Sequence, residues 1–314
     1  MPRSSSLRIR ALASVVATGA IVATLALAGP LNPPAGPVAP TAKPLAEIEP
    51  RIAINDANTP SSDTAMFVIN RPGSYYLATN IVAAPGKHGI LVVSGGVTLD
   101  LNGFDLVGNP DSAGSNGIFV LASAFVRIHN GSIRGWGGSG IDVGVTRGSF
   151  ISDVRSTDNT GYGIRGGTNT VLRDCVTINN SSGIRVEQGS TVDRCVSSEN
   201  AVHGIEATNA CIISNNNCNL NGKIGDGAGI LILGTDNRIE SNSCIRADRG
   251  IDIAAAGNII IKNTCSGNTL NWSIAANNIF GPIIDRTAPA SAAVSGNAAA
   301  STLGSTDANA NFTY

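Results

Sequence analysis

The sequence predicts an all-β solenoid built from parallel strands. The dipeptide Gly-Ile recurs along the chain at intervals of 28, 23, 23, 20, 21, 25 and 21 residues. A period in the twenties is typical of solenoids, in which each repeat buries its apolar face against its neighbours. No window carries the 3.6-residue apolar stripe of a helical repeat. The copies begin at Gly89, Gly117, Gly140, Gly163, Gly183, Gly204, Gly229 and Gly250, and Ser273-Ile274 is interpreted as a ninth.

Each repeat holds the elements of one coil. Every Gly-Ile opens an alternating run such as Gly183-Ile-Arg-Val, the pattern of a strand with one buried face. A small polar pair follows, such as Gly189-Ser190 after this run, and predicts a tight turn. A second β-rich run, a third short segment and a turn that often carries Asn complete the period. One repeat therefore predicts about three strands, with successive coils about 4.8 Å apart.

The Gly-Ile strands, the Asn-bearing turns and the repeat length, over roughly residues 85–285, resemble the right-handed parallel β-helix of the pectate-lyase-like superfamily. The nine copies of the repeat predict about nine coils. Residues 48–85 depart from the repeat and are interpreted as a β-rich N-terminal cap over the first coil. Because this fold carries lyases, hydrolases, epimerases, adhesins and phage tailspikes, the resemblance implies no single activity.

The two ends of the chain have different compositions. Residues 1–28 combine an Arg-bearing start, an apolar stretch and the small-residue site Ala26-Leu27-Ala28, which predicts a signal peptide and a mature chain from Gly29. Residues 29–47 are a Pro/Ala-rich linker, 48–286 form the β-helix domain, and 287–314 are predicted as a flexible tail whose Phe312 and Tyr314 can dock. We expect an exported protein, periplasmic, cell-surface or extracellular, with no membrane span in the mature chain.

Composition limits the partners. The net charge is −1 and the mature sequence has no run of Lys or Arg, which argues against nucleic acid. Five of the six cysteines fall once per coil, and Val154 takes the corresponding place one coil earlier, which indicates an interior position and favours buried free thiols. One or two disulfides between adjacent coils and, less favoured, metal ligation remain as alternatives. No cofactor is evident from the sequence.

One column of residues is the candidate binding face. The residue after each Gly-Ile points outward, and the middle of this column reads Asp142, Arg165, Arg185 and Glu206. Tyr162, His203 and Trp136 are expected beside it. The planar guanidinium of arginine binds a carboxylate at two points, so the column could hold an acidic polysaccharide. The alternative is structural, since opposite charges on neighbouring strands form a ladder of ion pairs.

A second candidate is a pair of carboxylates. Asp153 and Asp174 occupy equivalent places in adjacent repeats and are weak candidates for a metal site, although Asp is also a common turn residue. Under the resemblance, a lyase would use an arginine base assisted by Ca²⁺. The epimerase motif Asp-Pro-His-His and the hydrolase motifs of the superfamily are absent. The sequence therefore favours an exported protein that binds polysaccharide or another surface component, with a polysaccharide lyase or glycoside hydrolase as the alternative.

Overall fold

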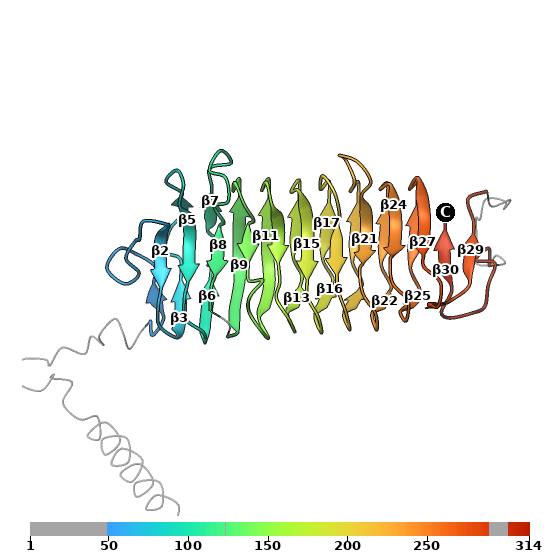
Figure 1. The fold of residues 1–314 in the computed structure, drawn as a ribbon, viewed down its shortest axis with the longest axis horizontal. Coiled ribbons are helices and arrows are strands. Elements are labelled where there is room, and N and C mark those ends of the chain that lie inside the picture. The colour runs from blue at the N-terminus through green and yellow to red at the C-terminus, as the bar shows by residue number, and fades with distance from the viewer. Residues whose placement is uncertain (1–48, 123, 289–300) are drawn as a thin grey trace, which may run out of the picture. The chain divides into compact units, whose positions relative to one another are not determined.

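The computed structural model describes residues 49–122, 124–288 and 301–314. These residues form a right-handed parallel β-helix, with coils stacked in chain order from β2 to β29 (Figure 1). The described residues include no helix, and hence none long and apolar enough to cross a membrane. The predicted signal peptide and linker lie outside the described residues.

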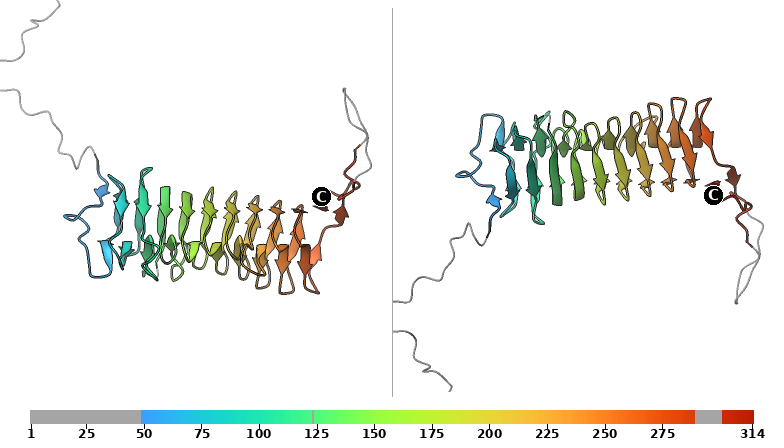
Figure 2. Two further views of the ribbon diagram at one scale, coloured as in Figure 1. Left: turned by 90° about the horizontal axis from the view of Figure 1, so that it is seen from above. Right: turned by 90° about the horizontal axis from the view of Figure 1, so that it is seen from below.

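Each coil contributes strands to three faces. Figure 2 shows the stacked coils from above and from below. The first face is a ten-stranded sheet: β2 (Ala65–Ile69), β5 (His88–Val92), β8 (Ile118–Val120), β10 (Ile141–Asp142), β12 (Tyr162–Arg165), β15 (Ser182–Val186), β18 (Ile205–Ala207), β21 (Ala228–Ile232), β24 (Arg249–Ile253) and β27 (Leu270–Ile274). The second face is β1 (Ile52–Ala53), β3 (Gly73–Tyr76), β6 (Val97–Asp100), the first parts of β9 (Val126–Arg134) and β11 (Phe150–Thr157), β13 (Val171–Arg173), β16 (Thr191–Asp193), β19 (Ile212–Ser214), β22 (Arg238–Glu240), β25 (Ile259–Ile261) and β28 (Ile279–Phe280). The third is β4 (Ile81–Val82), β7 (Asp105–Val107), the ends of β9 and β11, β14 (Val176–Ile178), β17 (Val196–Ser198), β20 (Asn217–Asn219), β23 (Ser243–Ile245), β26 (Thr264–Ser266), β30 (Asn311–Thr313) and β29 (Ile283–Asp285).

The isoleucines of the Gly-Ile pairs form one buried stack on the first face, as predicted. Ile90, Ile118, Ile141, Ile164, Ile184, Ile205, Ile230 and Ile251 follow one another in register, and all have 0% exposure. Close packing between coils explains why glycine precedes each of these isoleucines. A Cβ on Gly163 would lie 2.8 Å from the carbonyl oxygen of Gly183 and 2.9 Å from Nδ2 of Asn180. Any larger residue would therefore push adjacent coils apart.

The repeat in the structure begins and ends at other residues than the sequence predicted. Residues 65–82 form a complete coil, because β2, β3 and β4 pair with β5, β6 and β7. The ten-stranded first face therefore gives about ten coils rather than about nine, and a cap extending to residue 85 is not confirmed. Ser273-Ile274 is not the ninth copy, since Trp272 is the partner of Ile251 and Ile274 that of Ile253. The alternation of two residues hid this shift, because both registers bury the same face.

Buried asparagines join successive coils through their side chains. In one column the backbone N–H groups of Asn159, Asn180 and Asn200 donate to Oδ1 of the asparagine one coil further, at 3.2, 3.0 and 3.2 Å. Further columns contain Asn216, Asn242, Asn263 and Asn311, and Asn237, Asn258 and Asn278. These amides satisfy backbone donors at the bends between faces, where the strand ladder is interrupted.

All six cysteines are buried free thiols, as the favoured interpretation predicted. Cys218, Cys244 and Cys265 are direct neighbours on β20, β23 and β26. Cys195 stands next to Asn216 in an asparagine column and donates its backbone N–H to Oδ1 of that residue. Cysteine therefore shares interior positions with small polar residues as well as with valine.

The end of the chain returns to the third face. β30 pairs with β26 on one side and β29 on the other, which places Phe312 between Thr264 and Ile284. The indole nitrogen of Trp272 donates to Oγ1 of Thr313 at 2.8 Å. The predicted tail thus includes an ordered part. Phe312 docks at the end of the stack as expected, and Asn311 is the last asparagine of one buried column.

Candidate functional site

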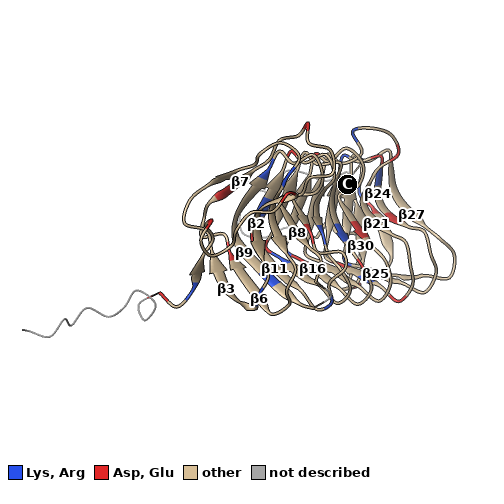
Figure 3. Cartoon of the chain, turned by 60° about the vertical axis from the view of Figure 1, so that its left-hand side comes forward, with Lys and Arg blue, Asp and Glu red and all other residues tan. Residues whose placement is uncertain are grey.

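The predicted charged column is present on the outer side of the first face. Asp142, Arg165, Arg185 and Glu206 are direct neighbours on β10, β12, β15 and β18. Arg165 lies 3.5 Å from Asp142, and Arg185 lies 3.4 Å from Glu206. Acidic and basic residues are interspersed along the coils rather than gathered by sign (Figure 3). The ladder of ion pairs considered from the sequence is therefore present.

Arg185 is the most constrained member of the column. Its Nε donates to Glu187 at 3.1 Å, and Nη1 lies 3.5 Å from the hydroxyl of Tyr162. The Glu206 side chain is almost buried, with 8% exposure. A guanidinium held by three neighbours has little capacity left for a ligand carboxylate. Arg165 is freer, because its side chain is 42% exposed and its Nε has no hydrogen-bond partner in the described chain.

Trp136 does not belong to this face. Its side chain has 0% exposure, and its Nε1 donates to the carbonyl oxygen of Leu106 at 3.3 Å in the core. The prediction that placed it beside the binding column is wrong. The turn before Gly140 directs this large side chain inward, where it fills the space beside Gly89, Gly108 and Gly117.

His203 lies beside the column, as predicted, with a structural role. Its Nδ1 accepts the backbone N–H of Ala228 in the next coil at 3.1 Å. His88 does the same for Asn116 at 2.9 Å. Burial lowers the pKa of both imidazoles, although Glu206 opposes this shift at His203 and Asp142 at His88. Both rings therefore favour the neutral form with the proton on Nε2.

Asp153 and Asp174 are turn residues in the structure. Both have left-handed backbone, with φ of 54° and 55°, as do Arg194 and Asn215 in the next two coils. Arg194 hydrogen-bonds both carboxylate oxygens of Asp174 at 2.8 Å and holds the pKa of that carboxyl below its usual value. Across the part of the chain that the structure describes, no three His, Cys, Asp or Glu residues could hold a metal ion. The geometry therefore favours the turn interpretation for this pair.

A polar cleft that sequence reasoning missed lies at the corner where strands of the first face end. This corner cleft is lined by Arg147, Thr168, Asn169, Gln188, Gly189 and Ala210 and has a volume of 190 Å³. Its residues follow β10, β12, β15 and β18, so it adjoins the side of the face that carries Arg165. The sequence marked Thr168-Asn169 and Gly189-Ser190 only as turns. The missed signal was the large polar side chains Arg147 and Gln188 beside those turns.

The side chains of the corner cleft are available for a ligand. Arg147, Asn169 and Gln188 are exposed, and their side chains make no hydrogen bond to another described residue. Gly189 has left-handed backbone, with φ of +74°, and a Cβ on it would lie 2.2 Å from Oδ1 of Asn169, so glycine leaves room for that side chain. The lining contains one cationic residue and no carboxylate. The cleft therefore offers a guanidinium and two amides within reach of one small polar group.

Comparisons with known proteins agree with this fold. A family model described as the right-handed β-helix region matches residues 66–219. Pectate lyase Pel9A is similar in structure, with a TM-score of 0.51, 17% identity, and coverage of 73% of this chain and 71% of that one. The match to the Dettilon tailspike protein covers 80% of this chain and 60% of that protein at 14% identity. Its TM-score of 0.41 adds nothing to the assignment. The comparison with curated proteins found no match. By its coils, the chain has the right-handed parallel β-helix fold, and the solved structure of a pectate lyase is similar to it.

Proposed function

We propose that this protein is exported and binds an acidic polysaccharide at the corner cleft, with the chain of sugars continuing over Arg165 on the first face. The observation that carries the proposal is the set of unused polar groups in the cleft. Arg147 has no ion-pair partner among the described residues, whereas Arg185 is paired twice. An unpaired guanidinium beside two free amides suits a sugar that carries a carboxylate and hydroxyl groups.

The fold supports a polysaccharide as the partner. A solved structure of similar fold is that of a pectate lyase, and this likeness at 17% identity concerns the fold alone. Repeated coils about 4.8 Å apart suit an extended polymer, since one chain can contact several coils. Arg185 is neutralised by Glu187 and Glu206, and Arg165 shares its charge with Asp142 at 3.5 Å. We therefore expect Arg147 to provide most of the attraction for an anionic chain, and the 42% exposed side chain of Arg165 to add to it.

Calorimetric titration with pectate, alginate and a neutral glucan at two salt concentrations tests the proposal. We expect salt-sensitive binding of an acidic polysaccharide and at least about tenfold weaker binding by Arg147→Gln and by Asn169→Ala, which is about 1.4 kcal/mol. Arg246→Gln is the matched control, because Arg246 is also exposed and makes no ion pair with a described residue. Binding of no acidic polysaccharide, or equal binding by Arg147→Gln and the wild type, would contradict the proposal.

The same samples test the alternative that the protein is a lyase or hydrolase. Release of unsaturated sugar would place it among the lyases, where Ca²⁺ would be the expected cofactor, and release of reducing ends alone would indicate a hydrolase. Substitution of Arg165 by Ala separates the two functions. Loss of binding is expected for a binding protein, whereas loss of product with binding retained would indicate a catalytic role.

A further inference from the structure

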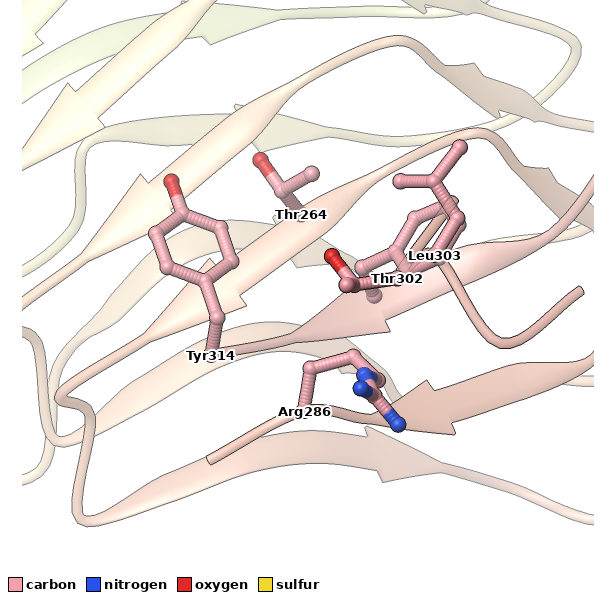
Figure 4. A pocket seen from close by; sticks show the side chains of 6 residues that line it. Thr264, Arg286, Thr302, Leu303 and Tyr314 are labelled. Carbon is pink, nitrogen blue, oxygen red and sulfur yellow. The ribbon is translucent and has the colours of Figure 1, made fainter. Parts of the chain in front are cut away.

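A second pocket, distant in sequence from the corner cleft, lies on the outer side of the third face near the end of the chain. Its volume is 320 Å³, and it is lined by Thr264, Arg286, Thr302, Leu303, Phe312 and Tyr314. Figure 4 shows Tyr314 on one side of the pocket, Leu303 on the other and Arg286 along the lower edge. This arrangement combines an apolar and aromatic wall with a single cation.

The strand order explains how these residues meet. β30 inserts between β26 and β29, which brings Phe312 between Thr264 and Ile284. Arg286 follows β29, and its backbone N–H donates to the carbonyl oxygen of Thr313 at 2.7 Å. A Cβ on Gly304 would lie 3.5 Å from Nη1 of Arg286, so the guanidinium packs beneath the loop that carries Thr302 and Leu303.

The adjacent Asp285 balances the charge of Arg286 only in part. Hydrogen bonds from Thr287 and, after them, the charge of Arg286 lower the pKa of that carboxyl. Arg286 still lacks a direct ion-pair partner among the described residues, and its Nε is buried without a hydrogen-bond partner. The sequence of residues 289–300, whose placement is not described, contains no Asp or Glu. A buried donor of a charged group without a partner is unfavourable, so an acceptor is expected at this site.

We propose that this pocket binds a small amphipathic carboxylate, whose apolar body contacts Phe312, Leu303 and Tyr314 and whose carboxylate pairs with Arg286. A predominantly apolar pocket with one convergent cation is the usual form of such a site. The two threonine hydroxyls can donate to the same carboxylate. The site shares no residue with the corner cleft, so it adds a second ligand to the proposed function and does not depend on it.

Phenylacetate and its neutral analogue phenylacetamide test the inference on the full chain by NMR titration. We expect phenylacetate to shift the amide resonances of Thr264, Thr302 and Leu303 and to bind at least about tenfold more tightly than phenylacetamide. Arg286→Gln should weaken phenylacetate binding about tenfold and abolish the difference between acid and amide. Arg246→Gln is the control and should bind like the wild type.

Two outcomes would overturn the inference. One is equal binding of the acid and the amide by the wild type, which would remove the role of the charge. The other is the absence of shifts at the pocket residues at the highest soluble phenylacetate concentration. If Arg286→Gln does not fold, the comparison of acid and amide on the wild type decides the question alone, and Tyr314→Ser, which removes an exposed wall of the pocket, should weaken both ligands.

Discussion

Replacement of Asn200 by alanine should destabilise the β-helix by about 3 kcal/mol, although it removes only a small polar side chain. The side chain is completely buried. Its Oδ1 accepts from the backbone N–H of Asn180 at 3.0 Å and from the Asn180 amide at 3.1 Å. Its Nδ2 donates to Ser197 at 3.1 Å and to Asn221 at 2.9 Å. The variant therefore leaves a buried backbone donor without an acceptor.

The magnitude follows from these contacts. A buried polar group that loses its partner costs about 1–3 kcal/mol, and each net hydrogen bond contributes about 1 kcal/mol. The Asn180 amide keeps two carbonyl acceptors, those of Ser156 and Ile178, so its loss is partial. With about 1 kcal/mol for the backbone donor, the lower end of this range, and about 1 kcal/mol for each of the two bonds donated by Asn200, the sum is about 3 kcal/mol.

Chemical denaturation of the wild type, Asn200→Ala and Asn219→Ala measures this effect. Asn219 is the control, because it is a partly exposed asparagine on β20 whose side chain bonds to no described residue. We expect a change within about 0.5 kcal/mol for the control. Equal stability of the two variants would refute the claim that the buried amides hold adjacent coils together.

Three further predictions concern the core, the histidines and the thiols. Ile184→Ala should lower the free energy of unfolding by about 2–5 kcal/mol, because the side chain has 0% exposure, whereas Ile212→Ala at 44% exposure should cost far less in the same denaturation assay. The contribution of His88 and His203 to stability should be full above about pH 6.5 and should fall at lower pH, because burial lowers their pKa in the folded protein and the unfolded chain takes up the protons more readily. His203→Gln should therefore flatten the dependence of the melting temperature on pH between about pH 5 and pH 8. A thiol reagent should modify none of the six buried cysteines in the native protein and all six after unfolding, since burial raises the pKa of thiols such as Cys211, and fast native labelling would argue against the interior placement.

The repeat was predictable because its cause is local and recurs in every coil. The glycine of each Gly-Ile pair lies where a Cβ would clash with the next coil. The spacing of the pair therefore predicts how the coils stack, their register and the buried isoleucines. Asp142, Arg165, Arg185 and Glu206 could be placed on neighbouring strands for the same reason. Period-two alternation predicts which face is buried but cannot separate a repeat from one shifted by two residues, as at Trp272.

The same pattern could not predict which side chains are free to bind a ligand. The charge of Arg185 suggested that it binds a ligand, whereas its guanidinium already contacts Tyr162, Glu187 and Glu206. Aromatic character placed Trp136 there, whereas the turn directs it into the core. The corner cleft is formed by the turns of four successive coils, so residues such as Arg147 and Gln188, two coils apart, meet only in three dimensions. Asparagines expected in turns also proved to be buried connectors between coils.

Hydrogen–deuterium exchange with and without an acidic polysaccharide tests the central claim, that a sugar chain binds at the corner cleft and over the first face. Pectate and alginate are the probes, and a neutral glucan is the control. We expect slower exchange in the turns around Arg147, Asn169 and Gln188, and no change on β14, β17 and β20 of the third face. The effect should be lost in Arg147→Gln. Protection confined to the third face, or no protection with either acidic polysaccharide, would contradict it.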